Sequence, residues 1–210
     1  MRRCLLFVGD YRWRFAETTP VLAVLVATLL AFLTPNLHSQ SQPQNHAPRP
    51  VVSRSEETLE AWNEIGNKLI AMARDFPEDK YDFKVQKDQR TFAQNILHVA
   101  AVDYEAIRAV SGTKLGPDFG KDAENPSRAA YKTKADVVKL IEQAVADGAK
   151  LIHDQGDTGL DKVSKLPWAN SMVHSSFTWM EDIEHSGEHY GQLVVYYRAN
   201  NMVPPESRGQ

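Results

Sequence analysis

The sequence predicts an all-α protein whose main domain is a four-helix bundle. Apolar side chains recur at helical spacing in four segments of bundle length, and the residues between these segments are rich in Gly, Pro, Asp and Asn. No segment has the alternating pattern of a strand, and no internal repeat is visible. Because two of the connections are long, the helical pattern by itself leaves the topology of the bundle open.

The composition fits one globular domain with additional segments. The chain has 210 residues, of which 42% are hydrophobic and 24% charged, and its formal net charge is −3. This mildly acidic balance argues against binding to nucleic acid, which requires a basic face. Cys4 is the only cysteine, so the chain can form no internal disulfide and the domain has no cysteine for a metal site or a nucleophile.

Residues 1–41 have the pattern of a signal peptide or an N-terminal anchor. Arginines precede the apolar run Pro20–Leu33, whose length lies within the roughly 7–15 residues of a signal-peptide core and below the ~20 residues that span a bilayer comfortably. We therefore expect an extracytoplasmic protein, periplasmic or secreted; the alternative is a membrane-anchored protein with an uncleaved segment. The polar, Pro-rich composition of residues 42–54 predicts a flexible linker, and residues 55–207 are expected to form the bundle domain.

The four helices are expected at about residues 55–76, 91–110, 134–154 and 171–200. Ser55, followed by glutamates, is the expected start of the first helix, and Pro77 closes it. In the second helix, His98 lies opposite the apolar side, so periodicity alone predicts a surface histidine there. Asp103, by contrast, falls among the apolar positions and would need a partner if it is buried.

Two stripes of side chains run along the fourth predicted helix. The apolar stripe, which we expect to face the bundle core, consists of Phe177, Met180, Ile183, Gly187, Tyr190, Val194 and Tyr197. The opposite, polar stripe consists of Thr178, Asp182, His185, His189, Gln192 and Tyr196. Such a helix is suited to lining a cleft with its polar side. Trp168 is expected to pack under the connection that precedes this helix.

The polar stripe contains the motif with the clearest chemistry. His185 and His189 are four residues apart, so their imidazoles stand on the same face of a helix and can reach one metal ion. No Lys or Arg occurs between Lys165 and Arg198, whereas the segment carries Glu181, Asp182, Glu184 and Glu188. Acidic side chains without neighbouring basic ones, around two neutral imidazoles, are suited to binding a cation. The alternative is that the two histidines lie on an ordinary polar surface.

Three segments together resemble a known family. They are Gln94-Asn-Ile-Leu-His98-Val-Ala, His185-x-x-x-His189-x-Gly-Gln192, and the tail from Val194 through Arg198 to Ser207. Over residues 55–207 the chain is similar to the DinB/YfiT-like superfamily of metalloenzymes. The resemblance implies an up-down-down-up four-helix bundle, often homodimeric. It also implies a divalent metal ion, most often zinc or nickel, held by His98, His185 and His189.

The resemblance further implies an enzyme of hydrolase or thiol-transferase type that acts on a small molecule. Three neutral imidazoles leave coordination positions open, as in catalytic rather than structural sites. Export argues against the thiol-transferase version, because low-molecular-weight thiols act mainly in the reducing cytoplasm. The alternative is a non-catalytic metal-binding or interaction module of the same fold. Glu181, Asp182, Glu188 and Gln192 lie within one turn of the paired histidines, but none is assigned as a general base.

Overall fold

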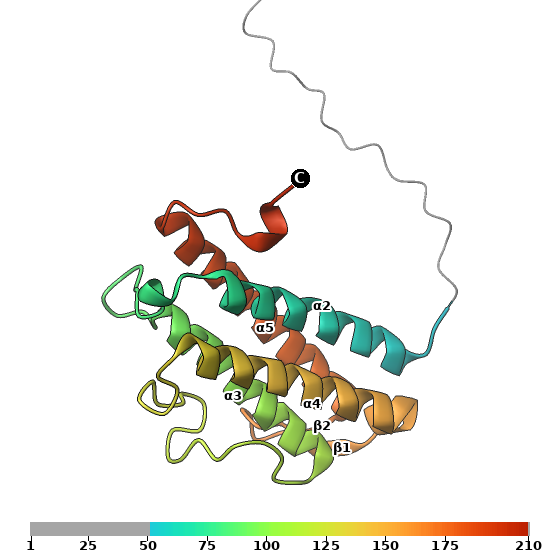
Figure 1. Cartoon of the computed structure of the whole chain (residues 1–210). Coiled ribbons are helices and arrows are strands. Elements are labelled where there is room, and N and C mark those ends of the chain that lie inside the picture. The colour runs from blue at the N-terminus through green and yellow to red at the C-terminus, as the bar shows by residue number, and fades with distance from the viewer. Residues whose placement is uncertain (1–50, 210) are drawn as a thin grey trace, which may run out of the picture. The chain divides into compact units, whose positions relative to one another are not determined.

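The computed structural model of the protein describes residues 51–209 (Figure 1). The predicted targeting segment 1–41 and residues 42–50 of the predicted linker lie outside this range. Four helices make up most of the fold: α2 (Arg54–Asp75), α3 (Phe92–Ser111), α4 (Lys134–Leu160) and α5 (Ser175–Ala199). Two short 3₁₀ turns, η1 (Glu78–Lys80) and η2 (Pro205–Ser207), and two strands, β1 (Val163–Lys165) and β2 (Met172–His174), complete it. Within residues 51–209 no helix has the length and apolarity needed to cross a membrane.

Contacts between the helices establish an up-down-down-up bundle. Helix α2 is antiparallel to α4, because Arg54 at its start pairs with Asp161 just beyond the end of α4. The pairs Trp62–Trp179 and Met72–Tyr197 advance together along α2 and α5, so these helices are parallel. The pairs Asn95–Tyr196 and His98–His185 run in opposite senses, so α3 is antiparallel to α5. The predicted fold class and topology are confirmed (Figure 1).

Reciprocal side-chain caps start three of the helices. In α2, α3 and α4 the N-cap hydroxyl accepts from the third backbone N–H, and the side chain at that third position accepts from the N-cap N–H. The three pairs are Ser53–Glu56, Thr91–Gln94 and Thr133–Asp136. The predicted start at Ser55 was therefore wrong by one residue, since Ser53 is the cap and the helix begins at Arg54.

The predicted boundaries of the third and fourth helices also differ from the structure. Regular α4 is interrupted at Gly156, which has φ 57°, and one further turn reaches Leu160 instead of ending at Asp154. Strands β1 and β2 form an antiparallel hairpin with Ser164 opposite Val173. The sequence pattern did not predict this hairpin, because two three-residue strands are too short to show an alternation. The hairpin also delays the start of α5 to Ser175.

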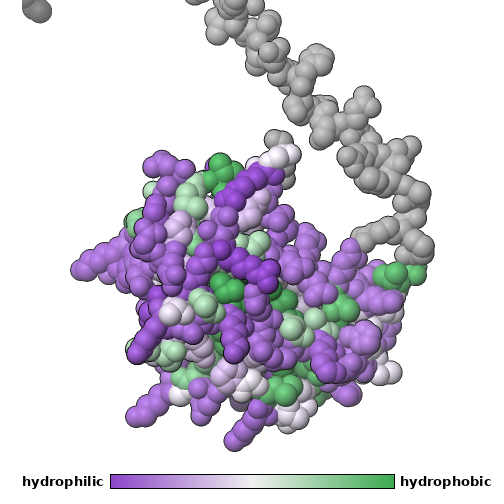
Figure 2. All heavy atoms as spheres, in the orientation of Figure 1, coloured by the Kyte–Doolittle hydropathy of each residue, from purple (hydrophilic) through white to green (hydrophobic). Residues whose placement is uncertain are grey.

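Aromatic side chains dominate the core between the helices. Phe76 and Phe92 stack with ring centroids 3.9 Å apart, and Tyr197 meets Phe76 edge-on at 5.0 Å. Toward the other end of the bundle, Trp62 meets Trp179 at 5.2 Å. These rings are buried, whereas the molecular face in Figure 2 is mainly hydrophilic with small, separate hydrophobic areas.

Helix α5 buries most of the stripe that was expected to be its polar, cleft-lining side. Phe177 and Met180, expected in the core, are 39% and 55% exposed. The buried face instead consists of Ser175, Thr178, Trp179, Asp182, Ser186, His189, Leu193, Tyr196 and Tyr197. The core-stripe prediction was therefore wrong for Phe177 and Met180, whereas Tyr197 is buried and Ile183, Tyr190 and Val194 pack partly buried against the core. The helix also turns polar residues toward the other three helices, which the pattern did not predict.

Alanine in place of Gly148 is expected to destabilise the fold. A Cβ at this position would lie 2.3 Å from Cζ2 of Trp62, whose Nε1 donates to the Val145 carbonyl at 2.9 Å. Because this bond and Trp179 hold the ring, we expect a loss of about 1–3 kcal/mol, measured by denaturant unfolding. Gly191→Ala is the control, since nothing lies within 4 Å of its Cβ position. Equal stability of the two variants would contradict the expectation.

Candidate metal centre

Three histidines from two helices converge at one point of the bundle. His98 comes from α3, and His185 and His189 come from α5. One ring nitrogen from each lies within 4.8 Å of the other two. The Nε2 atoms of His98 and His185 are 3.2 Å apart. We call these three residues the triad; they are the residues that the family resemblance implied.

His98 is only 6% exposed, so its assignment to the surface from periodicity was wrong. The reason is that 15 of the 20 residues of α3 are buried, and neighbours cover the helix on nearly every side. The connection between α3 and α4 supplies one of these neighbours. Its Glu124 carbonyl oxygen lies 2.7 Å from Nδ1 of His98. The Arg90 guanidinium also approaches Nδ1, at 3.4 Å, but the shorter contact is with a carbonyl, which only accepts, so Nδ1 carries the proton and Nε2 carries the lone pair.

A chain of hydrogen bonds sets the tautomer of His189 in the same way. Nδ1 of His189 lies 3.1 Å from Oδ1 of Asn95. The amide nitrogen of Asn95 donates to the Thr91 carbonyl and to the Tyr196 hydroxyl, each at 3.1 Å, which identifies the oxygen that faces His189. Tyr196 in turn donates to the Arg90 carbonyl. His189 therefore donates through Nδ1 and leaves Nε2 free.

His185 lacks such a support. Its Nδ1 is buried and has no hydrogen-bond partner among the described residues. Its Nε2 faces the lone pair on Nε2 of His98, and two imidazole nitrogens at this distance need a proton or a cation between them. Of the three rings, His185 is thus the one whose orientation depends most on what the triad holds.

Burial keeps the triad neutral at pH 7. It lowers the pKa of His185 to about 4 and that of His189 to about 3, and neighbouring imidazoles add to both effects. Burial is also the largest cause of the lowered pKa of His98. Neutral imidazole is the form that binds a metal ion.

The donor set fits a divalent metal ion. Three neutral imidazoles from two helices match the ligands of catalytic zinc sites, which keep further positions open. A ligating histidine commonly donates its other N–H to a carbonyl or carboxylate, as His98 does to Glu124 and as His189 does, through the equivalent amide oxygen, to Asn95. The residues present could therefore hold zinc, nickel or another imidazole-binding metal.

An acidic cavity of about 290 Å³ opens beside the triad. Its lining consists of His98, Val102, Glu105, Glu124, Trp168, Glu181, Glu184, His185 and Glu188. Neither Lys nor Arg lines it, and the five carboxylates form no ion pair within the described part of the chain. Trp168 is 36% exposed at this cavity, so the expectation that it packs under the connection was wrong.

Comparison with known proteins gives the family. The family model of the DinB superfamily matches residues 61–193. The chain belongs to the DinB superfamily. Among solved structures it is similar to YfiT from Bacillus subtilis, described as a probable metal-dependent hydrolase with an unusual four-helix bundle topology. The TM-score is 0.53 at 13% identity, over 75% of this chain and 94% of that one, so the likeness concerns the fold. No curated protein sequence matches.

This DinB-superfamily chain also buries a polar layer next to its triad. The layer consists of Asp103 from α3 and Thr178, Asp182 and Ser186 from α5, and we call it the buried acid layer. These side chains are at most 3% exposed. Ser186 donates to Asp103, which supplies the partner that the sequence position required. Burial raises the pKa of both carboxyl groups; Asp182 raises that of Asp103 further, and Glu105 that of Asp182.

The other residues considered near the triad divide into two groups. Glu181 and Glu188 line the acidic cavity, as their position one turn from His185 suggested. Gln192 is exposed and lines a different cavity, together with Arg90 and Tyr196. Gln192 is therefore not among the groups around the triad. The carboxylates of Glu105 and Glu124 reach the cavity from α3 and from the following connection. Helical spacing predicted Glu105 on the same side of its helix as His98, whereas it gave no signal for Glu124.

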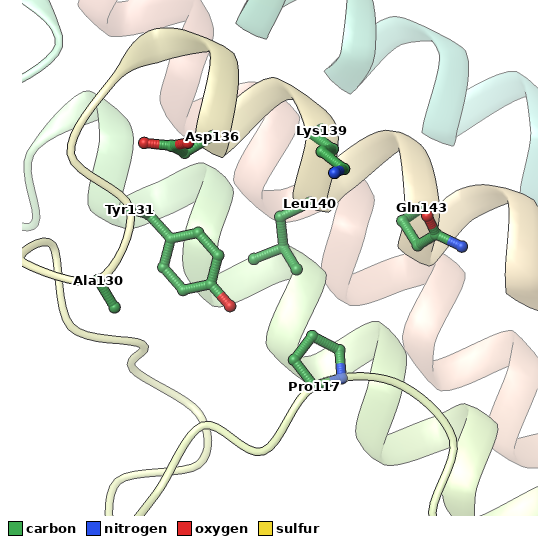
Figure 3. A pocket seen from close by; sticks show the side chains of 7 residues that line it. All are labelled: Pro117, Ala130, Tyr131, Asp136, Lys139, Leu140 and Gln143. Carbon is green, nitrogen blue, oxygen red and sulfur yellow. The ribbon is translucent and has the colours of Figure 1, made fainter.

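The DinB-superfamily bundle has another cavity, of about 320 Å³, between the α3–α4 connection and α4. Figure 3 shows Tyr131 of the connection beside Leu140 of α4, with Pro117 and Gln143 farther along the opening. Its one carboxylate, Asp136, is engaged in the cap of α4. This cavity lacks a histidine and lacks convergent titratable groups, so the triad cavity is the better candidate for a reaction site.

Proposed function

We propose that the protein is a divalent-metal-dependent hydrolase that acts on a small molecule, with His98, His185 and His189 as the metal ligands. The observation that carries this proposal is the donor geometry: three neutral imidazoles converge, and two of them are fixed through Nδ1 so that Nε2 is left free. The description of YfiT as a probable metal-dependent hydrolase supports the same reaction class.

His98, His185 and His189 would hold a divalent ion, which would supply Lewis-acid chemistry: polarisation of a substrate oxygen and a lowering of the pKa of water toward ~7. The protein supplies a base beside it. Glu105 lines the cavity and is half-buried, and burial, with Glu124 adding to it, raises the pKa of its carboxyl group. A carboxylate with a raised pKa can take a proton from the attacking water more readily than an exposed one. We assign this role to Glu105.

The acidic lining favours a neutral or positively charged substrate. Five carboxylates and no Lys or Arg line this small cavity, and although Arg108 acts on Glu105 from outside the lining, the negative potential that results repels anions. Thiol cosubstrates that carry carboxylates would meet this repulsion, so the cavity supports hydrolysis over thiol transfer. Trp168 adds an aromatic surface suited to a cationic group, and we propose zinc or nickel as the metal.

Localisation outside the cytoplasm remains part of the proposal. It rests on the arginines and the apolar run of residues 1–41. Zinc is compatible with an oxidising compartment because it has no redox chemistry.

Glutamine in place of Glu105 is expected to remove hydrolysis while the metal stays bound. The purified domain should bind about one equivalent of zinc, measured by elemental analysis, and hydrolyse choline-type or amine-bearing esters faster than succinate-type ones. We expect Glu105→Gln to lower kcat by about 10²–10⁴-fold, because one general base is lost. Glu60→Gln, on α2, is the matched control.

Three results would contradict parts of this proposal. Absence of zinc and nickel binding would refute the metal centre. Metal binding without turnover of any ester or amide in the panel would favour the non-catalytic binding module. Full activity of Glu105→Gln would remove that residue from the mechanism but leave the metal centre standing.

A further inference from the structure

The buried acid layer leaves four oxygen atoms without partners. They are Oδ1 of Asp103, Oδ1 and Oδ2 of Asp182, and Oγ1 of Thr178. Thr178 and Asp182 are fully buried, and Asp103 is 2% exposed. An isolated buried carboxylate is costly, and buried charges are found paired or bound to metals. Four unsatisfied oxygen atoms in one layer therefore form a set of acceptors that suits a bound cation.

The register of the two helices places these oxygen atoms opposite one another. Asn95 of α3 bonds His189 of α5, and His98 faces His185, so a step forward along α3 corresponds to a step backward along α5. Continuing from His98 to Asp103 leads to the level of Asp182. Thr178, Asp182 and Ser186 follow at intervals of four residues on one face of α5. Hydrogen bonding of Ser186 to Asp103 shows that this face meets α3.

The donor chemistry of the layer differs from that of the triad. Its atoms are carboxylate and hydroxyl oxygens, with no imidazole or sulfur, and such hard donors suit magnesium or manganese rather than zinc or nickel. Carboxylates that project into a bundle core are a common way for helices to hold such ions. Two facing carboxylates also supply the two negative charges that a divalent cation would neutralise.

We propose that the buried acid layer is a second cation site, in which Asp103 and Asp182, with the hydroxyls of Thr178 and Ser186, bind a hard divalent cation such as Mn²⁺ or Mg²⁺. The site lies one helical turn from the triad along α5, because Asp182 precedes His185 by three residues. The two sites together form a centre in which nitrogen ligands hold one ion and oxygen ligands hold the other.

Glu105 couples the acidic cavity electrostatically to the buried acid layer. It lines the acidic cavity and acts electrostatically on Asp182. A cation attracted into the cavity by its five carboxylates would therefore meet Glu105 before it reaches Asp182. The same carboxylates would bind a proton in the absence of the cation, since burial raises the pKa of both aspartates. Occupancy is thus best measured at pH 8, where competition from protons is smaller.

Manganese binding to the zinc-loaded protein tests the second site. The protein is first loaded with one equivalent of zinc, freed of excess zinc, and titrated with Mn²⁺ at pH 8, with free Mn²⁺ counted by electron paramagnetic resonance. The expected result is about one further equivalent of bound Mn²⁺. Absence of tightly bound Mn²⁺ in this wild-type experiment would overturn the proposal and would mean that the layer holds protons or water.

Variants separate this site from the triad. Asp182→Asn keeps the size of the side chain and should lose the Mn²⁺ equivalent while it retains zinc; Asp79→Asn, at an exposed position, should keep both. His98→Ala should lose zinc and still bind Mn²⁺ in the layer. Loss of Mn²⁺ in His98→Ala but not in Asp182→Asn would place the manganese in the triad and refute the second site. Circular dichroism establishes that each variant is folded.

Discussion

Alanine in place of His98 is expected to lower the affinity for zinc by at least about 100-fold and to abolish hydrolysis. The substitution leaves two imidazoles of the triad, and loss of a ligand should exceed the 10- to 100-fold effect typical of groups that only orient ligands. It also frees the Glu124 carbonyl that His98 now contacts at 2.7 Å. The affinity is measured by competition with a chromogenic chelator, and the fold is checked by circular dichroism.

His153→Ala is the matched control for this experiment. His153 lies on α4, its side chain is 76% exposed, and its polar partner among the described residues is the neighbouring Asp154. We expect this variant to bind zinc and turn over substrate like the unmodified protein. If His98→Ala binds zinc as tightly as His153→Ala, the triad is not the metal site.

Alanine in place of Asn95 is expected to weaken zinc binding by about 10- to 100-fold without changing the three ligands. Asn95 is 2% exposed, and its Oδ1 is the acceptor that fixes Nδ1 of His189. Without it, the buried N–H of His189 loses its partner, which also costs about 1–3 kcal/mol of stability. Chelator competition gives the affinity, and urea unfolding of the metal-free protein gives the stability.

Two further substitutions distinguish orientation from simple loss of packing. Asn95→Asp retains an oxygen acceptor and should keep most of the affinity for zinc, although its stability should fall because it no longer donates to Thr91 and Tyr196. Asn67→Ala, on the exposed side of α2, should change neither property. An Asn95→Asp variant as weak as Asn95→Ala would mean that the amide acts through packing alone.

The sequence predicted the fold well because all four helices have apolar side chains at helical spacing and are separated by segments rich in Gly, Pro, Asp and Asn. It predicted His185 and His189 as a pair from their spacing, since both lie in one helix. His98 lies in another helix, and only the family resemblance identified it. Periodicity predicted that His98 faces solvent. This prediction failed because α3 is buried on nearly all sides, so the side of the helix opposite its apolar residues is buried as well.

Helix α5 shows why the buried face of a helix that carries site residues is hard to predict from its hydrophobic pattern. The side that packs inward carries Thr178, Asp182 and His189, while Phe177 and Met180 are exposed. A hydrophobic pattern locates the buried face of a helix only when its polar side chains face solvent. In α5, several polar side chains face the bundle core instead. The disagreement between pattern and burial is thus concentrated on the residues that surround the two proposed ion sites.

The parallel arrangement of α3 and α4 has a consequence for how this family can diversify. After α3 the chain must return about 30 Å, the length of a 20-residue helix, before α4 can begin in the same direction. Residues 112–133 make this return, and they bring Glu124 to His98 and to the wall of the acidic cavity. Surface connections tolerate insertions and replacements that helices do not. Changes in the sequence of residues 112–133 alone could therefore alter substrate specificity, while the helices and their histidines stay the same.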